Sequence, residues 1–246
     1  MGKIRIIALI CLTVGLSSLQ SYSQGVVARP TQPSKKNSKN NKNNSNENSL
    51  TPIAIQKQDI PKKSNQPTKG LIVGHEWVDL GLPSGVKWAT CNVGASNSSE
   101  NGKYFICGET VEYGNAYVPK NRYKLLSEGI INSSGTINRQ HDAASANWGG
   151  SWRMPTEAEV RELLSKCHWT WTSINGKRGF KITGPNNNTI FLPAAGYHNG
   201  SDIIGFGNSC SYWSSSINRD GSAYYWGGGS EWGSRGYKRP VRPVTN

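Results

Sequence analysis

The sequence lacks the clusters of cysteine and histidine that hold zinc in proteins. Its cysteines form no CxxC pair, and its histidines are scattered at positions 75, 141, 168 and 198. His168 follows Cys167 directly, but adjacent residues on a helix point about 100° apart, so we expect no activated thiol there. No two carboxylates suggest glycoside hydrolysis. We therefore expect no metal, no cofactor and no catalytic activity.

The sequence also lacks an apolar run long enough to cross a membrane as a helix. The run from Ile6 to Leu16 is too short, and it lies between Lys3 and Arg5 on one side and small polar residues ending at Ser23 on the other. This three-part order is typical of a secretory signal peptide over residues 1–23. It predicts a secreted or cell-surface protein without a transmembrane helix.

Most of the formal net charge of +13 lies outside the residues expected to fold. Residues 29–69 account for +7 of it, whereas residues 71–246 carry only +4. Binding to a polyanion requires several cations that converge on one groove, so we expect no nucleic-acid partner. Residues 24–70 are rich in Asn, Lys, Ser and Pro, a composition that predicts a disordered tether.

The remaining residues, 71–246, are enough for one domain with a hydrophobic core. Short strands are expected at 77–80, 86–89, 104–107, 179–183, 189–192, 212–215, 223–226 and 241–244, separated by glycine-rich turns. A brief helix capped by Asp142 is expected over 142–148. The predicted fold class is α+β, with short antiparallel strands in the majority and long glycine-rich loops.

One main helix is expected near 157–167. Thr156 and Glu159 stand three apart, as in a capping box, and Val160, Leu163, Leu164 and Cys167 form one apolar stripe. Arg153 precedes this helix. Guanidinium groups in glycine-rich folds often tie loop carbonyls together, so we expect structural roles for Arg153 and Arg242.

Six phrases together carry a resemblance to a known family. They are WVDLGLPSGVKWATCNVGA (77–95), GET (108–110), NWGGSWRMPT (147–156), LPAAGY (192–197), YWSSS (212–216) and VRPV (241–244). In this order they resemble the Fibrobacter succinogenes major paralogous domain over nearly all of residues 75–244. That family is common in exported and surface proteins of gut and rumen bacteria, and the resemblance implies a variant of the C-type-lectin-like fold.

A more distant similarity is to formylglycine-generating enzymes, which share that broad fold and the pattern of 153–159. Those enzymes carry a copper-binding cysteine pair near the end of the domain, whereas Cys210 has no cysteine neighbour. We therefore do not carry over oxidase activity. The motifs of calcium-dependent sugar lectins are also missing, because Gly184-Pro185-Asn186 is only a turn.

The cysteines of the exported chain predict disulfides, since Cys91, Cys107, Cys167 and Cys210 are an even number in an oxidising compartment. The family often has cysteines at the positions of Cys91 and Cys167, so the resemblance implies that these two pair. A second bridge between Cys107 and Cys210 is a further hypothesis. Buried free thiols are the alternative.

Aromatic residues are numerous, with 9 Trp and 10 Tyr. Trp88, Trp148, Trp152 and Trp213 lie beside strands and glycines, where packing is the expected role. The ligand candidates lie in or next to glycine-rich loops that can keep side chains exposed: Tyr197, His198, Tyr224, Tyr225, Trp226 and Trp232. The segment 217–236 is expected to line the binding face.

These observations predict a non-catalytic binding or adhesion module that recognises a glycan or a surface protein without a calcium-sugar motif. Two alternatives from other classes remain. One is an enzyme of the formylglycine-generating type, which requires a deep pocket with a thiol or paired acids. The other is a structural component of a surface assembly, which requires an exposed apolar patch.

Overall fold

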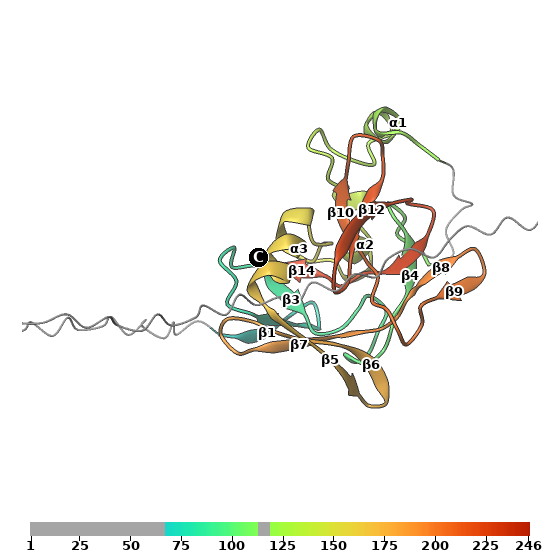
Figure 1. Ribbon diagram of the computed structural model, residues 1–246. Coiled ribbons are helices and arrows are strands. Elements are labelled where there is room, and N and C mark those ends of the chain that lie inside the picture. The colour runs from blue at the N-terminus through green and yellow to red at the C-terminus, as the bar shows by residue number, and fades with distance from the viewer. Residues whose placement is uncertain (1–66, 113–118) are drawn as a thin grey trace, which may run out of the picture. The chain divides into compact units, whose positions relative to one another are not determined.

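The computed structural model describes residues 67–112 and 119–246 (Figure 1). The expected signal peptide and most of the expected tether lie outside the described residues. In the described part, short antiparallel strands predominate over helices. This agrees with the predicted α+β class. Strand β1 (Lys69–Ile72) begins slightly before the expected domain start at Leu71, because it pairs with β2.

The first sheet has the order β1-β2-β3-β14. Strands β2 (His75–Asp79) and β3 (Lys87–Ala89) pair around the turn that the sequence predicts at 81–85. Strand β14 is only Val244–Thr245, so the expected strand at 241–244 is wrong in its extent. Pro240 and Pro243 have no backbone N–H to donate, which limits regular pairing in this part of the chain.

The second sheet has the order β10-β11-β12, and the third has the order β4-β13-β8-β9. The strands of the second sheet are β10 (Tyr212–Ile217), β11 (Ala223–Trp226) and β12 (Ser230–Gly233). Those of the third are β4 (Tyr104–Ile106), β13 (Lys238–Pro240), β8 (Tyr197–Asn199) and β9 (Asp202–Ile204). Strands β4, β10 and β11 lie where the sequence predicts them. Strands β8, β9, β12 and β13 are additional.

Two apolar cores lie on opposite sides of β2, β3, β10 and β11, because successive strand residues point to opposite faces. In β10, Tyr212 belongs to one core and Trp213 to the other. Core 1 contains Trp77, Trp148, Trp152 and Trp213, whereas core 2 contains Trp88 and Trp226. The strand alternation therefore distributes the expected packing tryptophans over two separate cores.

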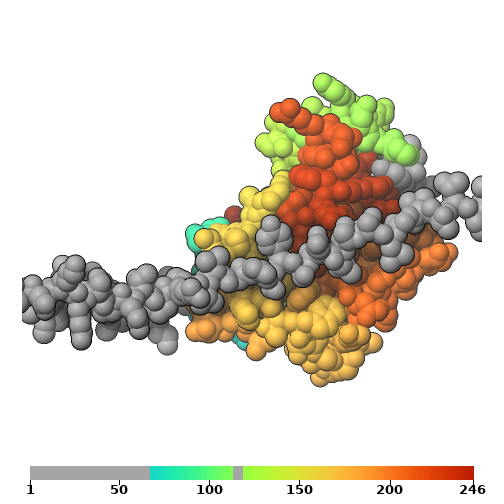
Figure 2. All heavy atoms as spheres, viewed as in Figure 1, coloured from blue at the N-terminus to red at the C-terminus, as the bar shows by residue number. Residues whose placement is uncertain are grey.

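The fourth sheet has the order β5-β6-β7, with strands β5 (His168–Ile174), β6 (Lys177–Thr183) and β7 (Thr189–Pro193). The β6–β7 pair confirms the predicted strands at 179–183 and 189–192, whereas the pairing of β6 with β5 is additional. The β5–β6 hairpin projects from the rest of the described domain and forms the gold protrusion at the lower edge of Figure 2. Each of its two faces can therefore line a different hollow.

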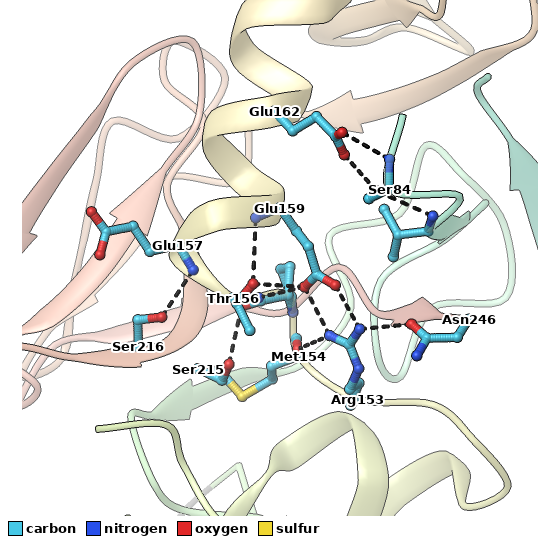
Figure 3. Close-up of polar contacts among 12 residues, drawn as sticks. Ser84, Arg153, Met154, Thr156, Glu157, Glu159, Glu162, Ser215, Ser216 and Asn246 are labelled. Atoms are coloured by element: carbon cyan, nitrogen blue, oxygen red, sulfur yellow. Dashed lines mark hydrogen bonds and ion pairs between the residues drawn. The ribbon is translucent and has the colours of Figure 1, made fainter. Parts of the chain in front are cut away.

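The main helix α3 (Glu157–Lys166) begins with the predicted capping box. The Thr156 hydroxyl accepts a hydrogen bond from the Glu159 N–H at 3.3 Å, and the Glu159 carboxylate accepts one from the Thr156 N–H at 2.8 Å (Figure 3). Farther along the helix, the Glu162 carboxylate accepts hydrogen bonds from the N–H and the hydroxyl of Ser84. These contacts attach α3 to the β2–β3 turn.

The remaining helices are short: α1 (Arg122–Ser127), the 3₁₀ helix η1 (Arg139–His141) and α2 (Ala143–Trp148). Asp142 caps α2 as expected, since its side chain accepts a hydrogen bond from the Ser145 N–H at 2.8 Å. The same carboxylate accepts one from the Met154 N–H at 2.8 Å, which joins α2 to the segment before α3. Burial raises the pKa of Asp142, although these hydrogen bonds oppose the shift.

Candidate functional site

The four cysteines in the described residues are all free. Neither the Cys91–Cys167 disulfide nor the Cys107–Cys210 disulfide is present, and the two cores explain why. Cys91 and Cys107 belong to core 1, whereas Cys210 belongs to core 2 and Cys167 packs against it. Each expected pair is thus divided between two cores, and a disulfide requires its two Cα atoms to lie within about 7 Å.

The free thiols are poorly suited to nucleophilic chemistry. Burial raises the pKa of Cys107 and of Cys210 to about 12, and that of Cys167 to about 11. Burial also raises the pKa of Cys91. Because the thiolate is the reactive form, these side chains behave as small apolar residues at neutral pH.

The predicted ligand residues Tyr224 and Trp226 are buried, each with an exposed fraction of 1%. They belong to core 2, because β11 is the central strand of its sheet and its side chains are covered on both faces. Neither ring is exposed as expected, which argues against ligand contact, although Trp226 borders a small hollow of about 170 Å³ together with Tyr225. Trp232 is 36% exposed on the edge strand β12, and its ring packs 5.0 Å from that of Tyr224.

The predicted ligand residues Tyr197 and Tyr225 contact an arginine of the same chain. The Arg239 guanidinium lies 4.0 Å from the ring centre of Tyr225, 4.2 Å from that of Trp213 and 4.8 Å from that of Tyr197. Tyr237 completes this aromatic cage at 5.1 Å. The cage already holds a cation, as cation–π attraction favours.

Arg239 is itself buried, with its Nε donating to the Ser211 hydroxyl at 2.7 Å. Its Nη1 has no hydrogen-bond partner among the described residues. Burial lowers the pKa of Arg239 to about 10. The four rings therefore compensate for lost hydration of a guanidinium that has few hydrogen bonds.

His198 is half-buried, and its ring meets that of Tyr104 edge to face at 4.6 Å. Burial and the neighbouring Lys238 lower the pKa of His198. The six predicted ligand residues are thus distributed over a core, an aromatic cage and two strand surfaces. The structure does not gather them around one hollow.

Arg153 and Arg242 make the contacts that structural roles require. Arg153 donates to both carboxylate oxygens of Glu159, at 2.8 and 2.6 Å, so it braces the start of α3 (Figure 3). Arg242 is fully buried. It donates to the side chain of Asn92 and to the carbonyls of Ala89, Thr90 and Phe191.

The buried indoles of Trp152 and Trp213 donate to the carbonyls of Ile72 and Phe105, respectively. Both rings therefore satisfy their N–H group while filling core 1. These two tryptophans connect segments far apart in sequence. They leave no indole face for a ligand, since both have an exposed fraction of 0%.

A hollow of about 400 Å³ lies beside Trp171, a residue that the sequence analysis did not select. We call it the Trp171 hollow. It is lined by Trp171, Arg178 and Phe180 of the β5–β6 hairpin and by Asn208, Ser209, Cys210, Gly227 and Gly228. The expected binding segment 217–236 thus contributes its glycine turn rather than its aromatic rings.

Trp171 is held in place but remains open to solvent. Its ring meets that of Phe180 edge to face at 4.8 Å, and 38% of the residue is exposed. The Arg178 guanidinium lies 5.8 Å from the Trp171 ring centre and donates to the Asn208 side chain at 3.0 Å. The hollow thus combines an exposed indole with guanidinium, amide and hydroxyl groups.

A glycine turn forms the wall opposite the hairpin. A Cβ atom at Gly228 would lie 2.7 Å from the Phe180 ring, and one at Gly227 would lie 2.4 Å from the Cys210 carbonyl oxygen. Only glycine allows the β11–β12 turn to approach the hairpin so closely. The signal that could have indicated this site is the alternation of Trp169 and Trp171 with threonines, which is typical of a strand.

A second hollow, of about 600 Å³, lies between β1–β2, the segment 90–98 and the strands β6–β7. Its hairpin residues Ile174 and Lys181 occupy the face opposite to Trp171, because the strand register alternates the faces. Among the described residues, no group of three or more His, Cys, Asp or Glu side chains is placed to hold a metal ion. No helix in the described ranges has the length and apolar character needed to span a membrane.

Comparison of the chain with protein-family models, with curated proteins and with solved structures finds no match.

Proposed function

We propose that the described domain is a non-catalytic glycan-recognition module that binds a sugar ring in the Trp171 hollow. The observation that carries this proposal is the exposed indole of Trp171 beside Arg178 and Asn208. A pyranose presents an apolar C–H face and a rim of hydroxyl groups. An aromatic ring flanked by hydrogen-bonding side chains complements both parts.

The setting of the module is part of the same proposal. A signal peptide over 1–23 exports the chain, and the polar segment 24–70 extends the domain from the cell or carrier surface. We also propose that the domain is a variant of the C-type-lectin-like fold and a Fibrobacter-type major paralogous domain. The phrases of the sequence, the predominance of short antiparallel strands and the single main helix α3 support this assignment.

Binding to a glycan panel tests the function, with Trp171→Ala as the main variant. Stacking of a ring on an indole contributes about 1–3 kcal/mol in other aromatic platforms, so Trp171→Ala should weaken binding by about tenfold or more. Trp232→Ala is the matched control, because Trp232 is similarly exposed at 36% but lies outside the hollow. Equal binding by wild type and Trp171→Ala, with folding verified by circular dichroism, would contradict the proposal.

A structural role in a surface assembly is the second candidate. The edge strand β9 and the turn after it expose Ile203, Ile204 and Phe206, with exposed fractions of 48%, 41% and 50%. An exposed apolar edge strand is a template for pairing with another chain. If a second copy of the chain pairs there, sedimentation should show a dimer that Ile203→Asp dissociates, whereas a monomer at all concentrations would remove this candidate.

A further inference from the structure

The larger hollow carries charged groups that the fold does not use. We call it the lysine cleft. Its polar lining includes Lys69 of β1, Glu76 of β2, Lys181 of β6, Ser96, Ser98 and Thr189. Its volume of about 600 Å³ is in the range of small-molecule sites, about 300–1,000 Å³.

Lys69 and Lys181 form no ion pair and no side-chain hydrogen bond with any described residue, and both are exposed. Other cations of the domain are engaged: Lys120 and Lys124 pair with Glu128, and Arg153 pairs with Glu159. The side-chain hydroxyls of Ser96, Ser98 and Thr189 likewise have no partner among the described residues. The cleft thus offers uncommitted donors on several sides.

The balance of charge favours an anionic ligand. The lining holds two ammonium groups and one carboxylate, that of Glu76, while the neighbouring Glu100 carboxylate accepts hydrogen bonds from the Ser96 N–H and the Asn97 side chain. The lining hydroxyl groups can donate as well as accept. Because a lysine ammonium group lies at the end of a flexible side chain, it can bind a carboxylate in several orientations. The apolar floor of Val78, Ile190 and Phe191 matches the C–H surface of a ring better than it matches a small inorganic ion.

We propose that the lysine cleft is a second binding site, which takes a carboxylate-bearing saccharide such as a hexuronate. Lys69 and Lys181 bind the carboxylate, and the serine and threonine hydroxyls bind ring hydroxyls. The choice of a saccharide among carboxylates rests on the proposed function. The cleft itself is separate, because it shares no lining residue with the Trp171 hollow.

Calorimetric titration of the full exported chain with digalacturonate tests this site, with the dimethyl ester of the same sugar as the uncharged control ligand. The acid should bind about tenfold or more tightly than the ester, and added salt should weaken the acid alone. The double variant Lys69→Gln/Lys181→Gln should lose about tenfold in affinity for the acid. Glu76→Gln should strengthen binding of the acid, because it removes the opposing negative charge.

Lys177→Gln is the matched control, since Lys177 is exposed on the same face of β6 as Lys181 but outside the cleft. It should leave digalacturonate binding unchanged. Equal binding of acid and ester, absence of digalacturonate binding, or an unaffected double variant would overturn the inference. These results would leave the Trp171 hollow untouched, whereas loss of acid binding in Trp171→Ala would place the acid in that hollow and overturn the second site.

Discussion

Two buried arginines show how the same residue type is stabilised in different ways. Arg242 donates hydrogen bonds to one side chain and three backbone carbonyls, whereas Arg239 has one hydroxyl partner nearby and four aromatic rings. Each compensates for the loss of water that accompanies burial of a guanidinium. Arg242 therefore connects the β3 end with β7, and Arg239 holds rings that the sequence analysis assigned to a ligand.

Replacing Arg242 tests its structural role. Arg242→Met leaves the carbonyls of Ala89, Thr90 and Phe191 without their donor in a buried site, so it should reduce the free energy of unfolding by about 3–5 kcal/mol. Urea unfolding monitored by tryptophan fluorescence measures the change. The exposed Arg219→Met should change stability by less than about 0.5 kcal/mol. A small effect at Arg242 would show that its hydrogen bonds contribute little.

Glu159 should make stability depend on pH. Burial favours a higher pKa, but the hydrogen bonds from Arg153 and Thr156 outweigh it, and the pKa of Glu159 is lowered. Its ionised form therefore stabilises the folded state fully above the ordinary carboxyl pKa of about 4.3, and this contribution disappears as pH falls through the lower folded value.

Glu159→Gln should accordingly destabilise the protein by about 1–2 kcal/mol at pH 7 and by progressively less as the solution becomes acidic. Unfolding curves of both proteins between pH 7 and pH 3 provide the comparison. A difference that stays constant over this interval would show that the Arg153–Glu159 pair does not couple folding to protonation.

At the scale of elements, the pairing of β6 with β7 depends on a close approach at Gly179. A Cβ atom there would lie 2.1 Å from the Leu192 carbonyl oxygen. Gly179→Ala should therefore cost about 1–3 kcal/mol, as overpacking does elsewhere. Gly229→Ala is the control, because nothing lies within 4 Å of its added Cβ. Equal melting temperatures for the two variants would show that the sheet adjusts freely.

Elements marked by local signals could be predicted from the sequence. The capping box of Thr156 and Glu159, the Asp142 cap and the turn at 81–85 each depend on residues close together in the chain, and all are present. Strands β8 and β9 pair with each other around a two-residue turn, which the local hairpin signal Asn199-Gly200 could have revealed. Strand β13 contains three residues and pairs with β4 and β8, which lie far along the sequence. No local pattern distinguishes such a segment from a loop.

The candidate site was harder to predict for the same reason. Tyr224 and Trp226 lie next to glycine-rich sequence, as exposed residues often do, but core 2 packs against the face of β11 that carries both rings. Trp171 becomes a site residue only because the distant Gly227–Gly228 turn and Asn208 lie beside it. The alternating aromatic and threonine residues of 168–174 predict a strand, yet they do not reveal which face meets a hollow.

At the scale of the whole molecule, the division into two cores determines the state of the cysteines. Cys91 and Cys107 lie in one core and Cys210 lies in the other, so the two expected disulfides are absent and these cysteines should be free thiols. Ellman's reagent should label Cys91, Cys107, Cys167 and Cys210 in denaturant, and should label the native protein slowly. Resistance of two of these thiols to labelling in denaturant without reductant would demonstrate a disulfide and contradict the free state of the four cysteines.

If both proposals hold, the two hollows on opposite faces of the β5–β6–β7 sheet would serve as two separate binding sites. The Trp171 hollow presents an aromatic ring, and the lysine cleft presents uncommitted ammonium and hydroxyl groups. Because the β5–β6 hairpin supplies residues to both, the orientation of this hairpin positions both sites together. An oligosaccharide with neutral and acidic units could bind the Trp171 hollow through a neutral unit and the lysine cleft through an acidic unit.

The most direct test is a crystal structure of the protein with the oligosaccharide that binds best in the glycan panel. The account predicts a sugar ring stacked on the Trp171 indole, at a carbon-to-carbon separation of about 3.5–4.0 Å, with hydroxyls bonded to Arg178 and Asn208. A sugar bound away from the Trp171 hollow, with that indole still exposed to solvent, would contradict it.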